Sequence, residues 1–143
     1  MKILIDTNVL FSALGFQGVS GQLLEELVRG NHTLVTSDYI LEELKQKITM
    51  KFTGPQQERA LTLLLFILSR MQMEVIKRPE YQENLEQTKG VVPEQDTPIL
   101  AVALLRDVDF LVTGDNHFLK NQKVEALGVS VLSPSDMLGL INP

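Results

Sequence analysis

The sequence contains no cysteine. This absence excludes disulfide bonds and metal sites built on thiolates, and it fits a protein of the reducing cytoplasm, which is the location we expect. Histidine is also scarce, with only His32 and His117. Because zinc in proteins usually takes cysteine or histidine ligands, a metal site in this chain is expected to rely on oxygen atoms instead.

Long hydrophobic runs are also missing. The most apolar stretch is ALTLLLFIL, from Ala60 to Leu68, whereas a membrane span needs about 18 or more such residues. We therefore expect no association with a membrane. The chain reaches Asp6 too early for a secretory signal, so none is expected there. A helix over 60–68 would be apolar around most of its circumference, which predicts a homodimer that buries part of it.

Positive charge is in deficit, with 13 lysines and arginines against 18 acids and a net charge of −5. This balance argues against a protein that binds duplex DNA through a broad basic surface. It does not exclude a nucleic-acid substrate, because several acids grouped around bound cations would leave the rest of the chain nearly neutral. The affinity would then come from a local patch or from the metal.

Short apolar runs without polar alternation indicate strands buried on both faces, as in parallel sheets. They are KILI (2–5), TLVT (33–36), MEVI (73–76), FLVT (110–113) and SVL (130–132). Helical periodicity lies between them, over 21–30, 37–48, 56–72 and 96–107. This alternation predicts one α/β domain over residues 1–143. The polar stretch 78–94 is expected to be a loop with a short helical piece.

Boundary residues fix several of these predicted helices. Ser37 or Asp38 is expected to cap the helix 37–48, and Gly54-Pro55 precedes the helix 56–72. Thr97 is a plausible cap for the last helix, with Pro98 at its first position.

Two acids follow predicted strands directly. In parallel sheets, sites form at the carboxyl ends of the strands. Asp6 ends the strand KILI, and Asp115 lies two residues beyond FLVT. Asp109 begins FLVT and therefore belongs at the opposite edge, as a solvated acid, and Asp107 ends a helix.

Two further acids belong to helices next to this edge. Asp96 precedes Thr97-Pro98 at a helix start, where an acid can also act simply as a cap. Glu43 lies toward the apolar side of the helix 37–48, while Glu42 faces solvent. Carboxylates that converge repel one another, and a hard divalent cation resolves the repulsion. Asp6, Glu43, Asp96 and Asp115 are thus our candidate ligands for Mg²⁺ or Mn²⁺.

Polar neighbours of these acids are expected to support the site. Thr7 and Asn8 would cap and start the helix after Asp6, and Asn8 is placed to hydrogen-bond a neighbouring carboxylate. Thr113 offers a hydroxyl near the same point. His117 is close to Asp115, but without a second histidine nearby we assign it to the surface or to the substrate side.

Two sets of side chains are candidate contacts for a nucleic-acid substrate. Three lysines follow Glu43 on or beyond the same helix and would contact phosphates: Lys45, Lys47 and Lys51. The other interpretation of this lysine set is an ordinary solvated helix face. Three aromatic rings are candidates for stacking on bases, although we favour core packing for them: Phe11, Phe16 and Phe118.

At this point the sequence resembles a known family. The segments ILIDTNVLFSAL, TSDYILEELKQKI, DTPILAVALLRDVDFLVTGD and HFL resemble the PIN-domain nucleases in order and spacing, over nearly the whole chain. The resemblance is greatest to bacterial and archaeal putative toxins of toxin–antitoxin modules. A lone D-T-N would be a weak signal, but four acids in this order and context are a strong one.

The resemblance implies a three-layer α/β/α sandwich around a parallel sheet of four or five strands. It implies that Asp6, Glu43, Asp96 and Asp115 are the catalytic acids, with Thr113 and Asn8 as polar companions. It further implies RNA cleavage with Mg²⁺ or Mn²⁺, homodimers and a small antitoxin partner. Relatives often carry two consecutive acids where this chain has Asp96-Thr97, so a second metal position is weakened here.

The predicted function is therefore that of a metal-dependent endoribonuclease that hydrolyses RNA phosphodiester bonds, and the resemblance implies that it is the toxin of a toxin–antitoxin pair. Two alternatives stay open. One is a catalytically silent PIN-like module that binds RNA or protein. The other is a phosphatase with Asp6 as nucleophile, although such sites usually have a second acid where this chain has Asn8, and Lys120 is only a loose candidate for their lysine.

Overall fold

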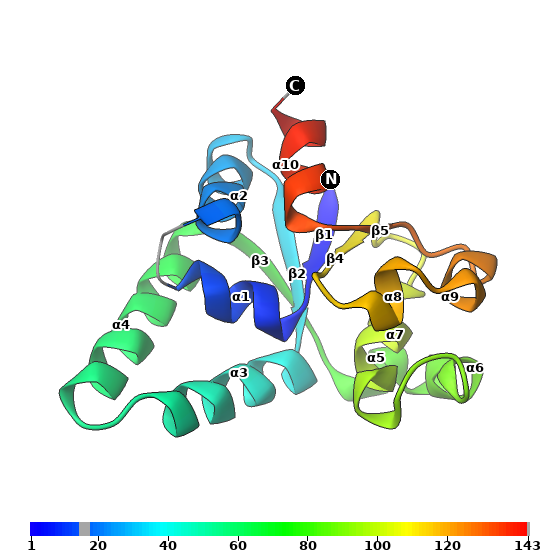
Figure 1. The fold of residues 1–143 in the computed structure, drawn as a ribbon, viewed down its shortest axis with the longest axis horizontal. Helices are drawn as coiled ribbons and strands as arrows, with labels where there is room; N and C mark the ends of the chain where they lie inside the picture. Colours follow the sequence, from blue (N-terminus) through cyan, green and yellow to red (C-terminus); the bar gives the residue numbers. More distant parts are fainter. Residues whose placement is uncertain (15–17, 143) are drawn as a thin grey trace.

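The central feature of the computed structural model, which describes residues 1–14 and 18–142, is a five-stranded parallel sheet (Figure 1). The strands are β1 (Lys2–Ile5), β2 (Thr33–Ser37), β3 (Gln72–Ile76), β4 (Phe110–Val112) and β5 (Val131–Leu132). They lie in the order β3-β2-β1-β4-β5, and every pairing is parallel. The predicted α/β class and its parallel sheet are confirmed.

The central strand β1 is buried because both of its faces are covered. Ile3, Leu4 and Ile5 have no solvent exposure. Ile3 lies opposite Leu34 of β2 on one side and Phe110 of β4 on the other. The apolar run that predicted a strand covered on both faces is therefore the core of the protein.

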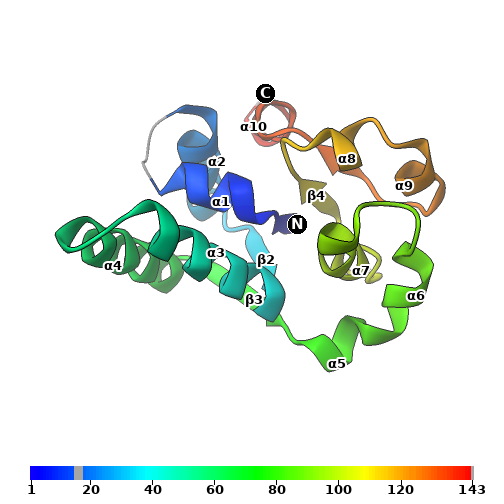
Figure 2. The same ribbon diagram turned by 60° about the horizontal axis from the view of Figure 1, so that its bottom comes forward.

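The helices form two layers, one on each face of the sheet, as Figures 1 and 2 both show. One layer contains α1 (Thr7–Ala13), α2 (Gly18–Arg29), α3 (Asp38–Lys51) and α4 (Pro55–Arg70). The other contains α5 (Arg78–Tyr81), α6 (Leu85–Thr88), α7 (Thr97–Ala103), α8 (Asn116–Leu119) and α9 (Gln122–Ala126). The last helix, α10 (Pro134–Ile141), packs against α2. The fold is thus the expected α/β/α sandwich.

Local signals place two helix starts as predicted. The Ser37 side chain accepts a hydrogen bond from the Ile40 N–H and caps α3. Gly54 precedes α4 with a φ of 55°, a backbone region that favours glycine, and Pro55 is the first helical residue. The helix predicted over 96–107 is shorter in the structure, because α7 ends at Ala103 and the chain tightens into turns that lead into β4.

The stretch 78–94 contains more helix than predicted. It holds α5, a 3-10 turn η1 (Gln82–Asn84) and α6, and a second 3-10 turn, η2 (Glu94–Asp96), follows. Tyr81 anchors the stretch because its ring is buried and its hydroxyl donates to Asp38 Oδ1 at 2.9 Å. The Arg78 N–H donates to Asp38 Oδ2 at the same distance. A tertiary contact, which local periodicity does not reveal, therefore orders this polar segment.

None of the helices within residues 1–14 and 18–142 combines the length and the apolar character required to cross a lipid bilayer.

Candidate functional site

Asp6 marks the point where the central strand meets its first helix. Its side chain is almost fully buried, and Oδ1 accepts a hydrogen bond from the Val9 N–H at 3.0 Å. Asp6 is therefore the N-cap of α1. The prediction that Thr7 and Asn8 cap this helix is wrong, since both belong to its first turn. The acid can both cap the helix and face the sheet edge because it has two oxygens.

The second oxygen of Asp6 connects β1 to β4. Oδ2 accepts a hydrogen bond from the Thr113 hydroxyl, and Thr113 has no solvent exposure. The same hydroxyl oxygen accepts the Asp115 N–H at 3.0 Å. Thr113 lies one residue beyond β4, so its side chain fixes the positions of the acids that follow two adjacent strands.

Glu43 reaches the same edge from α3. Oε1 accepts a hydrogen bond from the Thr7 hydroxyl at 2.8 Å, which ties α3 to the first turn of α1. Glu43 is half-buried next to the fully buried Leu44, whereas Glu42 is exposed. The predicted directions of the two glutamates are thus confirmed.

Asp96 arrives from the start of α7. It holds the N-cap position, but its side chain makes no capping hydrogen bond to the described helix. The prediction of Thr97 as the cap is wrong, because Thr97 is the first helical residue and its hydroxyl donates to the Glu94 carbonyl at 2.7 Å. The Asp96 carboxylate instead lies 3.2 Å from His117 Nδ1.

These side chains meet around one cavity of about 240 Å³ at the carboxyl edge of the sheet, lined by residues of α1, α3 and α7. The described residues that line it are Asp6, Thr7, Asn8, Glu43, Gln46, Lys47, Met50, Asp96, Ile99 and Asp115. All four predicted acids are present, together with Asn8. Of the three predicted lysines, Lys47 lines the cavity, whereas Lys45 and Lys51 are exposed elsewhere on α3.

The cavity disfavours ionised carboxylates. Burial raises the pKa of Asp6, and the nearby charges of Asp115 and Asp96 raise it further. Burial also raises the pKa of Glu43, with Asp96 adding to the effect, and it raises the pKa of Asp96, where Asp115 adds. A divalent cation would relieve this repulsion, and the donor set of carboxylate oxygens fits Mg²⁺ or Mn²⁺.

Two residues near the acids make contacts that the sequence analysis did not identify. His117 was assigned to the surface or the substrate side, and the structure places its Nδ1 3.2 Å from Asp96 Oδ2 and 3.4 Å from Asp115 Oδ1. Tyr39 donates its hydroxyl proton to the Gln95 carbonyl at 2.5 Å. Burial, Glu43 and Asp96 raise the pKa of Tyr39 to about 12. The spacing of His117 from Asp115 could have indicated the contact between these two residues, whereas no local signal indicates the contact of His117 with Asp96 or that of Tyr39 with Gln95.

Lys47 and the candidate aromatic residues have specific neighbours. Lys47 Nζ donates to Asn8 Oδ1 and lies 5.5 Å from the centre of the Phe11 ring. Phe11 stacks on Phe52 at 5.9 Å between ring centres, and Phe118 is buried, so both rings pack within the protein. Phe16 lies outside the described residues.

Asp109 lies at the opposite edge of the sheet, as predicted, and Asp107 and His32 lie there too. Lys2 donates from its backbone N–H to Asp109 at 2.7 Å and from its Nζ to Asp107 at 2.8 Å. His32 Nδ1 lies 3.4 Å from the amino group of Met1. These groups are engaged with the start of β1 and have no access to the acidic cavity.

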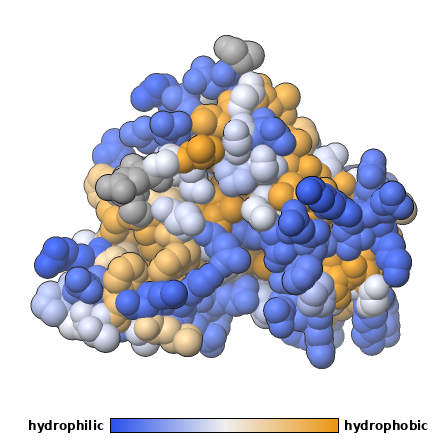
Figure 3. All heavy atoms as spheres, viewed as in Figure 1, coloured by the Kyte–Doolittle hydropathy of each residue, from blue (hydrophilic) through white to orange (hydrophobic). Residues whose placement is uncertain are grey.

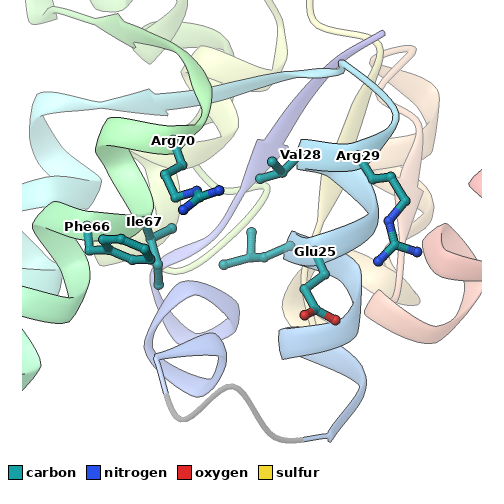
Figure 4. Close-up of a pocket in the computed structure, with 7 residues that line it drawn as sticks. Glu25, Val28, Arg29, Phe66, Ile67 and Arg70 are labelled. Atoms are coloured by element: carbon teal, nitrogen blue, oxygen red, sulfur yellow. The ribbon is translucent and has the colours of Figure 1, made fainter.

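A second hollow, of about 430 Å³, lies between α2 and α4 (Figure 4). Its lining is largely apolar and shares no described residue with the acidic cavity: Leu24, Glu25, Val28, Arg29, Phe66, Ile67 and Arg70. Glu25 is its single acid, so this hollow lacks the group of oxygen ligands that makes the first cavity a candidate for chemistry.

Comparisons with known proteins agree with this fold. The PIN-domain family model matches residues 2–117. The structure of VapBC2 from Rickettsia felis bound to a DNA fragment from their promoter is similar, with a TM-score of 0.64, 22% identity, and coverage of 93% of this chain and 98% of that one. PAE2754 from Pyrobaculum aerophilum gives a TM-score of 0.63 at 15% identity, covering 99% of this chain and 89% of that one.

FitAcB from Neisseria gonorrhoeae is a third similar structure, with a TM-score of 0.57, 18% identity, and coverage of 93% of this chain and 98% of that one. No curated protein matches the sequence significantly. At these identities the structural likenesses establish the fold, and the match to the family model, which spans most of the chain, establishes the family.

Proposed function

Because this chain belongs to the PIN-domain family, we propose that it is a metal-dependent endoribonuclease that hydrolyses RNA phosphodiester bonds with Mg²⁺ or Mn²⁺. The observation that carries the proposal is the convergence of four carboxylates, from Asp6, Glu43, Asp96 and Asp115, on one cavity. Burial and mutual repulsion raise the pKa of three of them, and a cation would offset this cost.

Asp6, Asp96 and Asp115 would hold the metal ion, directly or through water. When bound, such an ion polarises the phosphate and lowers the pKa of water. Each of these acids is positioned by a neighbour: Thr113 contacts both Asp6 and Asp115, and His117 contacts Asp96. Ligands that are held in place in this way lose little freedom when the ion binds.

Glu43 would orient the attacking water and accept its proton. The Thr7 hydroxyl keeps Oε1 in position, and the raised pKa of Glu43 suits a group that takes up a proton during hydrolysis. The water oxygen would attack phosphorus, the bond from phosphorus to the 3′ oxygen would break, and the 3′ oxygen would take up a proton from solvent water. The products would be a 5′-phosphate and a 3′-hydroxyl, as the family resemblance implies.

The substrate strand would enter beside Lys47, which lines the cavity and is the predicted lysine best placed to meet a phosphate. An aspartate-nucleophile phosphatase is disfavoured, since Asn8 occupies the position of its second acid and Lys120 is exposed and outside the cavity lining in the described chain. A silent binding module is disfavoured by the retention of all four acids.

The test is cleavage of a panel of single-stranded and structured RNAs by the purified protein with Mn²⁺, Mg²⁺ or a chelator. Asp6→Asn and Asp115→Asn proteins, shown to be folded by circular dichroism, serve as controls. We expect cleavage that requires metal and disappears in both variants. RNA binding that survives chelation, with no cleavage under any condition, would favour the silent module. A covalent phosphate on Asp6 would favour the phosphatase.

The role of a toxin is the finer part of the proposal and rests on the resemblance of the sequence to putative toxins. We expect expression of the wild-type chain to arrest bacterial growth and the Asp6→Asn chain to leave growth unchanged. If only the wild-type chain arrests growth, co-expression of a small antitoxin that covers the acidic cavity should relieve the arrest. Arrest by both chains would mean that toxicity does not depend on cleavage.

The proposed partner for α4 is a second copy of the chain. The stretch 60–68 buries Ala60 and Ile67 but leaves 67% of Leu65 and 51% of Phe66 exposed. On the side of the molecule where Figure 1 draws α4, the surface shows apolar atoms among hydrophilic ones (Figure 3), and Phe66 borders the hollow between α2 and α4 (Figure 4). Large side chains exposed on one face are typical of a protein interface.

A further inference from the structure

His117 lies among the acids in a way that the family resemblance does not account for. Its Nδ1 is 3.2 Å from Asp96 Oδ2 and 3.4 Å from Asp115 Oδ1. One ligand atom from each of these three residues lies within 4.8 Å of the others. Within residues 1–14 and 18–142, no other group of three acid or histidine side chains has its ligand atoms this close together. It comprises two oxygen donors and one nitrogen donor.

The separations fit neighbouring ligands of one ion. Adjacent ligands of an octahedral ion with bonds of about 2.1 Å lie about 3.0 Å apart. The observed distances exceed this value by only a few tenths of an ångström, and the imidazole can adjust because 52% of its side chain is exposed. The carboxylates are more firmly held, with 14% of the Asp96 side chain and 30% of the Asp115 side chain exposed.

The backbone keeps the imidazole in this position. The Asp115 side chain caps α8 by accepting the His117 N–H at 2.9 Å. This hydrogen bond holds the His117 backbone in the first turn of α8, next to the acid. Asp115 Oδ1, the oxygen 3.4 Å from Nδ1, accepts the His117 N–H with one lone pair and keeps a second lone pair for an ion. A histidine two residues after the last acid is therefore presented to the ligand set by the acid itself.

An imidazole nitrogen changes which ion the site prefers. Mg²⁺ favours oxygen ligands and water, whereas Mn²⁺ and the later divalent transition ions also accept nitrogen. We propose that His117 is a metal ligand of this site and that it makes the site select Mn²⁺ over Mg²⁺. This inference rests on the proposed function, because it assumes that the acidic cavity binds a divalent ion.

The same contacts would also exist if His117 were only an ion-pair partner of Asp96, so the test must detect the bond to the metal. Mn²⁺ is paramagnetic, and electron spin echo envelope modulation detects a directly bound nitrogen. Protein grown with ¹⁵N-histidine and loaded with Mn²⁺ should show ¹⁵N coupling. The chain suits this experiment because its one other histidine, His32, lies at the opposite edge of the sheet next to Met1.

Two matched variants assign the coupling. We expect it to persist in His32→Asn and to vanish in His117→Asn. Titration calorimetry should show that His117→Asn lowers Mn²⁺ affinity at least about tenfold and leaves Mg²⁺ affinity much less changed. His117→Asp, which completes an oxygen set, should raise Mg²⁺ affinity relative to His117→Asn. Thermal unfolding of each metal-free variant checks that the fold is intact.

Three results would overturn the inference: no Mn²⁺ binding by the wild-type protein, bound Mn²⁺ without nitrogen coupling, or coupling that persists in His117→Asn. An unchanged ratio of Mn²⁺ to Mg²⁺ affinity in that variant would refute the selectivity. These readouts need no RNA. A protein that binds Mn²⁺ through His117 but cleaves no RNA would therefore refute the proposed function and leave this inference standing.

Discussion

The buried hydroxyl of Thr113 donates a hydrogen bond to the carboxylate of Asp6. These residues are far apart in the sequence and stand at the ends of two paired strands, β1 and β4. The same hydroxyl oxygen accepts the Asp115 N–H, so one side chain sets the relative positions of the first and last acids of the cavity. The geometry of the acids thus depends on a residue that the solvent cannot reach.

Replacing Thr113 by valine tests this dependence. Valine keeps the size of threonine but removes the hydroxyl, so Asp6 loses a donor and Asp115 loses the acceptor for its N–H. We expect Mn²⁺ affinity and RNA cleavage to fall about 10–100-fold, the usual cost of losing a group that orients metal ligands. Thr113→Ser keeps the hydroxyl and should retain most of both. Losses in Thr113→Ser but not in Thr113→Val would mean that methyl packing, not the hydrogen bond, is what matters.

Asp6 has two roles that different substitutions separate. Asparagine caps helices well and removes the charge, whereas alanine removes both the cap and the charge. We expect Asp6→Asn and Asp6→Ala to lose metal binding and cleavage alike. Asp6→Ala should have a free energy of unfolding about 1 kcal/mol lower than Asp6→Asn, as is typical of a lost cap. Urea unfolding in chelator measures this difference, and equal stability would exclude a capping role for Asp6.

The fold was largely predictable because apolar runs and helix boundaries are local. KILI and TLVT read as strands covered on both faces, and that is how β1 and β2 lie in the sheet. The helical turns in 78–94 were underestimated because Tyr81 is ordered by Asp38, which is 43 residues earlier in the chain. The four-residue helix α8 was missed because it is too short to show a period.

The site was predictable to the level of its acids and less so beyond them. Because parallel strands end at one edge of a sheet, the sequence predicted that Asp6 and Asp115 lie close together. Helical periodicity predicted that Glu43 faces them. The cap of α1 was misassigned because Asp6, Thr7 and Asn8 are all good caps, and only the position of each side chain decides among them. The contact of His117 with Asp96 depends on how η2 approaches α8, which no local pattern reports.

The dependence of stability on pH should reveal the crowded carboxylates. The native pKa of Glu43 is raised, so between the unfolded value of about 4.3 and the native value the folded state binds more protons than the unfolded state. The contribution of Glu43 to the free energy of unfolding of the metal-free protein should therefore decrease as pH rises through that window. Glu43→Gln removes this loss, so its stability relative to the wild type should increase with pH and then level off.

Urea unfolding in chelator, between pH 4 and pH 8, measures this comparison. The exposed neighbour Glu42 provides the matched control, because Glu42→Gln removes a carboxylate from the same helix without changing the lining of the cavity. Saturating Mn²⁺ should reverse the slope in the wild type, since the ion requires the carboxylates to be ionised. A stability difference between Glu43→Gln and the wild type that is constant with pH would show that Glu43 titrates normally.

Lys47 should contact the substrate, and Lys51 should not. Lys47 lines the acidic cavity, held there by Asn8, while Lys51 is exposed at the end of α3. In an Asp115→Asn background, where RNA can bind without cleavage, Lys47→Gln should reduce the salt slope of RNA binding by about 0.7, the value for one phosphate of a single strand. Lys51→Gln should leave the slope unchanged. Fluorescence anisotropy at several salt concentrations measures both, and equal effects would assign the lysines to a diffuse charged surface.

The exposed face of α4 should control the oligomeric state. Leu65 is 67% exposed at the centre of the apolar stretch, so a second copy would bury it. Placing a carboxylate there with Leu65→Glu would leave an unpaired charge in an apolar interface, which is costly enough to dissociate it. Light scattering after size exclusion should give twice the chain mass for the wild type and the chain mass for Leu65→Glu.

Met50→Glu changes an even more exposed apolar residue, on α3, and should remain dimeric. A wild-type monomer at high micromolar concentration would remove the dimer, and loss of the dimer in Met50→Glu as well would place the interface beyond α4.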